Sequence, residues 1–198
     1  MRTRRRLWVD MSITLRLLGQ LMVAGVLALG VAGPAVAQES SSRYGMALLA
    51  GQAYDPERFG LVILQGNIQL PYGQVFWHAA PDSLFFKGEL NLGMTTDGRD
   101  RVLAAVNMMA VKYVENFSSA TWKPYLEGGI GVVYTDFRVK GQGLRFNFNP
   151  QIGIGFDFNT AGGRDMTIGV RLHHLSNADL HRDNRGINSV LMMTGVRF

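Results

Sequence analysis

Phe146-Asn-Phe-Asn-Pro-Gln-Ile-Gly-Ile-Gly-Phe-Asp-Phe158 is the stretch of this sequence that most clearly indicates its fold. Every second residue is apolar apart from one proline, and the residues between are amides, glycines and one aspartate. Side chains on a strand point alternately to its two faces, so this pattern predicts a β-strand with one apolar and one polar face. The small, amide-rich polar face suits the narrow interior of a small barrel.

Seven further segments alternate in a similar way and are separated by turn-forming residues. They cover residues 43–52, 59–77, 84–94, 102–114, 123–135, 165–176 and 188–198. Pro71 and Gly73 interrupt the second segment, where we expect a bulge within a continuing strand. The segment 102–114 is apolar on both faces, and its composition would also suit a helix.

Eight alternating segments of roughly ten residues, joined by short turns, match the signature of a transmembrane β-barrel. The sequence therefore predicts an all-β protein, an eight-stranded antiparallel transmembrane β-barrel. A soluble lipocalin-like barrel or sandwich, with the apolar face inside, would show the same alternation. Lys and Glu are sparse on the polar faces, which favours a lumen over a water-exposed sheet surface. The final Phe198 is similar to the terminal aromatic residue that bacterial outer-membrane proteins carry for assembly.

The chain begins with the features of a secretory signal peptide. Arginines at positions 2, 4, 5 and 6 precede the apolar run 21–32, and an Ala-Val-Ala ending follows at 35–37. This arrangement predicts a signal peptide over residues 1–37 and a barrel domain over residues 38–198. A transmembrane anchor is the alternative, but the apolar run is short and is followed by a helix-breaking proline at position 34.

Composition excludes several functional classes. The formal charge is +5, but residues 1–37 hold five arginines and one aspartate, so residues 38–198 carry only about +1. A nucleic-acid partner therefore has no electrostatic support. The chain has no cysteine, so packing or backbone pairing must stabilise the exported domain in place of disulfides. His, Asp and Glu show no metal-ligand spacing and no phosphate-binding loop occurs, so we expect neither metal nor cofactor.

A polar group interrupts the apolar faces near the C-terminus. His174 and Ser176 are two residues apart, and they continue the face that carries the apolar Val170. Asn188 lies on the apolar face of the last predicted strand. A histidine beside a serine is a base beside a potential nucleophile. Residues that merely end the apolar band in the lipid headgroup zone would show the same pattern.

Topology predicts the height of these residues in the membrane. With an even number of strands both termini lie in the periplasm, so the loop 177–187 is expected at the cell surface. The polar group would then face sideways into the outer leaflet, which is lipopolysaccharide in a Gram-negative outer membrane.

His174-Leu-Ser-Asn-Ala178, Asn184-Arg-Gly-Ile-Asn-Ser189 and Lys123-Pro-Tyr-Leu-Glu-Gly-Gly-Ile-Gly-Val132 resemble segments of the PagL-type lipid A 3-O-deacylases. The resemblance covers the second half of the mature chain well and the first half only in pattern. It implies an eight-stranded outer-membrane barrel that hydrolyses the ester-linked acyl chain at the 3-position of lipid A, without metal or cofactor. The implied partners are lipopolysaccharide and outer-membrane lipids. Oligomeric state is left open, with a homodimer as one option.

The resemblance also assigns roles. On the matching positions Ser176 would be the nucleophile and His174 the general base. Asn177 and Asn184 would help to stabilise the oxyanion. The family has a glutamate at the third triad position, where this chain has Asn188. An amide can orient a catalytic histidine, as in Cys-His-Asn proteases, although the same exchange costs about 10⁴ in rate in a serine protease.

This departure leaves three alternatives. The chain is a slower serine esterase that uses Asn188 directly, or it recruits Asp179 or Asp183 from the loop. The third alternative is a catalytically impaired or non-enzymatic small barrel with a structural or adhesive role. His173 has the opposite parity to His174 and is expected to be a hydrogen-bonded residue of the barrel interior.

Overall fold

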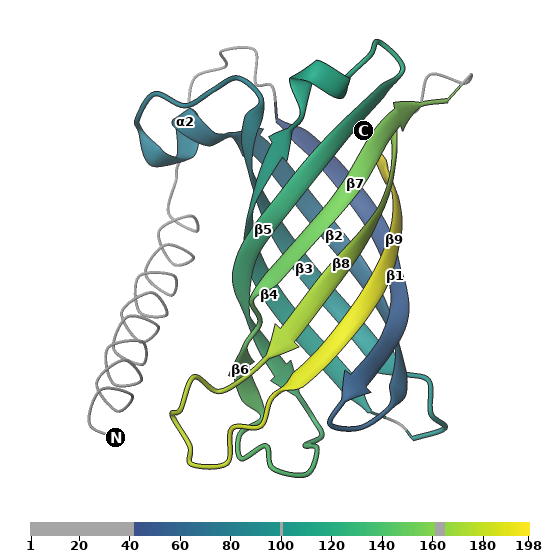
Figure 1. Ribbon diagram of the computed structural model, residues 1–198, viewed down its shortest axis with the longest axis vertical. Helices are drawn as coiled ribbons and strands as arrows, with labels where there is room; N and C mark the ends of the chain where they lie inside the picture. The colour runs from purple at the N-terminus through teal and green to yellow at the C-terminus, as the bar shows by residue number, and fades with distance from the viewer. Residues whose placement is uncertain (1–41, 100, 161–164) are drawn as a thin grey trace.

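In the computed structural model, which describes residues 42–99, 101–160 and 165–198, the chain is a closed antiparallel β-barrel (Figure 1). Strands pair in chain order around the ring, and the ring closes where β1 pairs with β9. The predicted signal peptide, residues 1–37, lies outside the described residues. The strands are β1 (Arg43–Asp55), β2 (Phe59–Pro71), β3 (Leu84–Thr95), β4 (Val102–Tyr113), β5 (Trp122–Thr135), β6 (Phe146–Phe148), β7 (Gln151–Asn159), β8 (Asp165–Leu175) and β9 (Ile187–Arg197).

The predicted strand 146–158 is one barrel strand interrupted at a proline. Both β6 and β7 pair with β5, so together they fill a single position and the barrel is eight-stranded as predicted. Proline has no backbone N–H to donate to a ladder. The Pro150 carbonyl still accepts a hydrogen bond from the backbone N–H of His174, at 3.0 Å. The interruption leaves the alternation of faces intact.

The expected continuation of the second strand through Trp77 is wrong. β2 ends at Pro71, and the short helix α2 (Tyr72–Phe76) follows, with a 3-10 turn η1 (Glu115–Phe117) at the same end of the barrel. Phe76 packs edge-on against Phe86, with ring centroids 5.9 Å apart. Phe86 is therefore only 3% exposed, although it lies on the outward face of β3. None of the helices in the described residues is long and apolar enough to cross a membrane.

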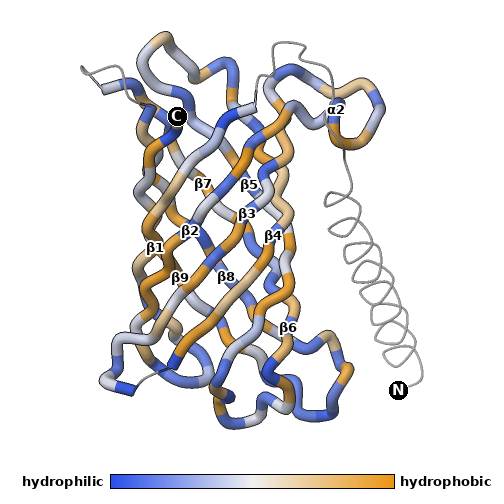
Figure 2. The backbone as a smooth tube through the Cα atoms, turned by 180° about the vertical axis from the view of Figure 1, so that it is seen from behind, coloured by the Kyte–Doolittle hydropathy of each residue, from blue (hydrophilic) through white to orange (hydrophobic). Residues whose placement is uncertain are grey.

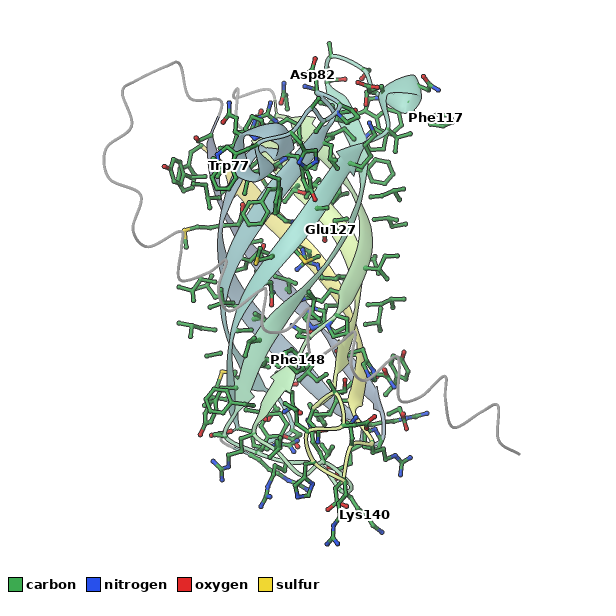
Figure 3. The ribbon with its side chains drawn as sticks, turned by 90° about the vertical axis from the view of Figure 1, so that its left-hand side faces the viewer. Trp77, Asp82, Phe117, Glu127, Lys140 and Phe148 are labelled. Carbon is green, nitrogen blue, oxygen red and sulfur yellow. The ribbon has the colours of Figure 1, made fainter. Side chains whose placement is uncertain are left out.

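The outer wall carries the apolar faces of the strands. At mid-barrel, large aliphatic side chains are between 51% and 63% exposed, and they come from β2, β3 and β7: Leu64, Leu90, Leu92, Ile152 and Ile154. Stretches of alternating apolar and polar positions are visible along several strands in Figure 2, and carbon-rich side chains project outward between the two ends in Figure 3. This is the wall that a lipid-spanning barrel requires.

The interior is packed and is not a pore. The half nearer the β8–β9 loop is mostly filled by apolar side chains: Leu49, Ala53, Phe59, Leu61, Ile63, Leu103, Ala105, Val133, Phe137, Leu175, Ile187 and Leu191. Met109, Val111 and Tyr113 of β4 are buried towards the other end. Residues 102–114 are therefore apolar on both faces because β4 contributes apolar side chains to the interior along its length. A cavity of about 20 Å³ is left between the apolar half and the polar middle, roughly room for one water molecule.

A charged network occupies the middle of the interior. The Arg171 guanidinium on β8 donates to both carboxylate oxygens of Glu89, at 2.9 and 3.0 Å, and to Glu127 through Nε at 2.8 Å. Lys87 pairs with the same two carboxylates. All four side chains are at most 6% exposed, and their charges balance. Glu127 is visible within the barrel at mid-height in Figure 3.

Arg171→Met is expected to lower the free energy of unfolding by about 3–5 kcal/mol, because two buried carboxylates would then share Lys87 alone. Urea unfolding of the barrel in lipid vesicles measures the change. Arg182→Met is the matched control, since the Arg182 side chain is 89% exposed and its loss should cost less than about 0.5 kcal/mol. Equal unfolding midpoints for the two variants would contradict a stabilising role for the network.

Candidate functional site

His174 and Asn188 form the centre of the candidate site. They are directly opposed on β8 and β9, and both point to the outer face of the barrel. Opposed side chains on one face of an antiparallel pair lie within contact distance. The His174 Nδ1 is 2.6 Å from the Asn188 Oδ1. An amide oxygen only accepts, so the ring must donate its Nδ1–H, which leaves Nε2 with a free lone pair to act as a base.

Ser176 follows His174 on the same outer face, just beyond the end of β8. Its backbone is fixed by two hydrogen bonds to Phe148 of β6, of 2.7 and 3.0 Å. The side chains of His174 and Ser176 are both half-buried. Within the described residues the ring of His174 bonds to Asn188 and not to Ser176. Base–nucleophile hydrogen bonds commonly tighten only in the substrate complex, so the shared face is the feature that pairs these residues.

His174, Asn188 and a third residue, which the sequence did not predict, form a row of hydrogen-bonded side chains on the outer face. Asp55, the last residue of β1, accepts a hydrogen bond from the Asn188 Nδ2 through its Oδ2, at 3.2 Å. Its other oxygen, Oδ1, lies 3.3 Å from an Arg185 Nη2. Asp55 reaches the outer face because the β1–β9 register shifts between Ala53 and Asp55, where an extra residue bulges the strand. A strict alternation of faces would have pointed Asp55 into the barrel.

The loop aspartates do not replace the expected glutamate. Asp179 Oδ1 accepts a hydrogen bond from the Asn184 Nδ2, at 2.9 Å. The Asp183 side chain lies near His181 and Arg182, at the limit of ion-pair distance. The carboxylate that the structure brings to Asn188 is Asp55, from the opposite end of the sequence. The alternative in which Asp179 or Asp183 takes the place of the family glutamate is therefore not supported.

Asn177 and Asn184, the residues expected at the oxyanion, hold the loop together. The backbone N–H of Asn177 donates to the Asn184 Oδ1 at 2.8 Å, and the Asn177 Nδ2 donates to the Asp183 carbonyl, also at 2.8 Å. Asn177 is fully buried. The next two residues, Ala178 and Asp179, have φ angles of 51° and 61°, so the chain turns sharply directly after Ser176 and Asn177.

The remaining histidines lie apart from this row. His173 points into the barrel as predicted and is 8% exposed, but its Nε2 has no hydrogen-bond partner among the described residues. His181 lies in the β8–β9 loop, where its Nδ1 accepts a hydrogen bond from the Asp183 N–H. In residues 42–99, 101–160 and 165–198 no group of three His, Cys, Asp or Glu side chains is placed to hold a metal ion.

Gly186 supports the His174 ring from the loop. Its φ angle is +79°, a left-handed conformation that favours glycine. A Cβ at this position would lie 2.9 Å from the His174 Cε1 and 2.9 Å from the Leu175 carbonyl oxygen. The loop can therefore close over the ring only when residue 186 has no side chain.

Gly186→Ala is expected to displace the His174 ring and break its bond to Asn188. The low-field NMR signal of the hydrogen-bonded Nδ1 proton should disappear in detergent-solubilised protein. Gly98→Ala is the matched control, because Gly98 has a φ of +75° but open space around its Cβ position. It carries the same backbone penalty, roughly 1–2 kcal/mol, without the clash. Retention of the signal in Gly186→Ala would show that the loop does not hold the ring.

Comparison with known proteins places the chain in a family. The family model for lipid A 3-O-deacylase (PagL) matches residues 62–197, which include β8, the β8–β9 loop and all of β9. A curated relative, the lipid A deacylase PagL of Pseudomonas aeruginosa, is 41% identical over 80 residues. That alignment spans 39% of this chain and 44% of the relative.

Solved structures show the same fold. The crystal structure of the outer membrane enzyme PagL matches with a TM-score of 0.57 and 23% identity, over 77% of this chain and 98% of that one. Neisserial surface protein A matches with the same TM-score and 13% identity, over 80% and 96%. Closed antiparallel barrels with an even number of strands and an apolar outer belt are bacterial outer-membrane proteins. The chain is accordingly an outer-membrane β-barrel.

Proposed function

Because the chain belongs to the lipid A 3-O-deacylase (PagL) family, we propose that it hydrolyses the ester-linked acyl chain at the 3-position of lipid A with a serine–histidine mechanism. The observation that carries the proposal is the 2.6 Å contact between the His174 Nδ1 and the Asn188 Oδ1, on the face that Ser176 shares. A base with a defined tautomer stands next to a serine on the outer wall of the barrel. No metal or cofactor takes part in the proposed reaction.

The reaction runs in two half-reactions. The Ser176 Oγ attacks the ester carbonyl carbon while its proton passes to the His174 Nε2. The tetrahedral intermediate collapses, the bond to the sugar oxygen breaks, and this oxygen takes the proton from His174. A water molecule, deprotonated by the same nitrogen, then attacks the acyl-serine. The products are a free fatty acid and lipid A with a 3-hydroxyl group, and Ser176 is regenerated.

Asn177 and Asn184 are proposed to stabilise the negative charge on the carbonyl oxygen. Each side-chain amide nitrogen has two hydrogens, and one of them is engaged within the loop. The second hydrogen of the half-buried Asn184 is the donor available for an oxyanion, whereas the fully buried Asn177 is proposed to act by holding Asn184 in place. Since the Asn184 Oδ1 also accepts from the backbone N–H of Asn177, the two residues are expected to move as a unit.

Substrate is proposed to approach from the membrane and not through the lumen. The interior cavity of about 20 Å³ is far smaller than the 300–1,000 Å³ of ordinary ligand pockets. On the outer wall, an apolar hollow of about 450 Å³ is lined by Ile154, Phe156, Ile168, Val170 and Met192, among others. Val170 is four residues from His174 on the same face of β8, about 13 Å at the usual rise per residue. An acyl chain fits such a surface.

The site is proposed to face the outer leaflet. β9 runs from the site to the C-terminus, so the two lie at opposite ends of the barrel (Figure 1). With both termini in the periplasm, the β8–β9 loop reaches the cell surface, where lipopolysaccharide is the lipid. Lipopolysaccharide and its lipid A are the proposed partners, together with neighbouring outer-membrane lipids.

Ser176→Ala and His174→Ala are each expected to abolish release of the 3-linked acyl chain, because they remove the nucleophile and the base. Lipid A extracted from cells that express each variant is compared by mass spectrometry. Ser189→Ala is the matched control: Ser189 lies at the same end of the barrel but is fully buried and points inward, so its removal should leave release unchanged. Undiminished release in the Ser176 or His174 variant would disprove the mechanism. No lipid change with the wild-type protein, despite a folded barrel, would favour a non-enzymatic role.

Asn188→Leu tests whether the histidine needs its amide partner. The leucine removes the Oδ1 acceptor at similar size, so the imidazole loses its fixed tautomer. We expect kcat to fall on the order of 10²–10⁴-fold, the range attributed to positioned acid–base groups. KM should change little, because Asn188 is proposed to act on the His174 ring and not in substrate binding. A kcat within twofold of the wild-type value would remove residue 188 from the site.

A further inference from the structure

We propose that Asp55 is a positioning residue for catalysis, and that it acts on His174 through the amide of Asn188. The inference rests on the proposed function, since it gives a role to a residue of the same site. A row of three side chains runs across the seam of the barrel, from Asp55 on β1 through Asn188 on β9 to His174 on β8. Its two hydrogen bonds measure 3.2 and 2.6 Å.

The carboxylate determines which way the amide points. An ionised carboxylate only accepts hydrogen bonds, so it binds the NH₂ end of Asn188 and repels the oxygen end. The oxygen is then directed to His174, where it can only accept. A reversed amide would present NH₂ to the ring, favour the tautomer protonated on Nε2 and leave no base next to Ser176. Asp55 thereby selects the active tautomer of His174 through two hydrogen bonds in series.

The same row supplies the negative charge that a family glutamate would have placed beside the histidine. When His174 takes the serine proton it becomes an imidazolium, which a nearby carboxylate stabilises. Here the carboxylate lies one amide further away, so a weaker effect is expected. Arg185 binds the other oxygen of Asp55, at 3.3 Å. Both groups of that pair are about half exposed, so the ion pair itself contributes little energy.

Exchange of the carboxylate of Asp55 with the amide of Asn188 separates this role from a structural one. Asp55→Asn and Asn188→Asp are nearly isosteric changes, and the double variant Asp55→Asn/Asn188→Asp holds the same groups in exchanged places. In the double variant the carboxylate contacts His174 directly and the amide at position 55 donates to it. Each single variant is defective for its own reason. Asp55→Asn loses the group that orients the amide, and Asn188→Asp sets two carboxylates against each other.

The four proteins are purified as folded barrels and assayed for kcat and KM on lipopolysaccharide in detergent micelles. We expect kcat to fall on the order of 10²-fold in Asp55→Asn with KM nearly unchanged, and to return to within about tenfold of wild type in the double variant. Asp136→Asn is the control. Asp136 lies in the β5–β6 loop at the same end of the barrel, accepts a hydrogen bond from the Val102 N–H and makes no contact with the row.

Each result has one meaning. Full activity of Asp55→Asn in a folded barrel overturns the inference and leaves the proposed function intact. A loss in Asp55→Asn that the exchange does not restore also overturns it, because a merely structural aspartate would behave that way. An inactive wild-type protein defeats the proposed function itself, before the variants are compared.

Discussion

Closure of the barrel between β1 and β9 is the constraint on which the rest of this structure depends. Lipid offers no hydrogen-bond partners, so every strand must pair on both sides, and the first strand must meet the last. This seam joins residues more than 130 positions apart, and it brings Asp55 to Asn188. The candidate site therefore lies where closure occurs, and it is assembled only when the ring is complete.

Closure also explains the two kinds of interior. Eight strands leave a lumen just wide enough for side chains to fill. The middle is filled by the balanced network of Arg171, Lys87, Glu89 and Glu127, and the end nearer the site by apolar side chains. Arg171 precedes His174 by three residues on β8, so its ion pairs fix the strand that carries the base. A filled interior and an apolar wall direct the chemistry outward, where a lipid substrate is met.

The relation between Asn188 and the family glutamate illustrates how a site can keep its chemistry with a different residue. An isolated amide is an ambiguous partner for histidine, since either end can point to the ring. A carboxylate behind the amide removes that ambiguity. The bulge at the end of β1 makes this possible, because it turns Asp55 from the inner face to the outer one.

Sequence alone determined the barrel, its eight strand positions and the shared face of His174, Ser176 and Asn188, because alternation is a local property that lipid and core enforce residue by residue. The prediction from sequence was wrong after Pro71, where the helix α2 replaces the expected continuation of the strand. Only the tertiary structure decided the hydrogen bonds of the site. Asp55 became a partner through the register of two strands from opposite ends of the chain and through one bulge, and neither is encoded in the period of a single strand.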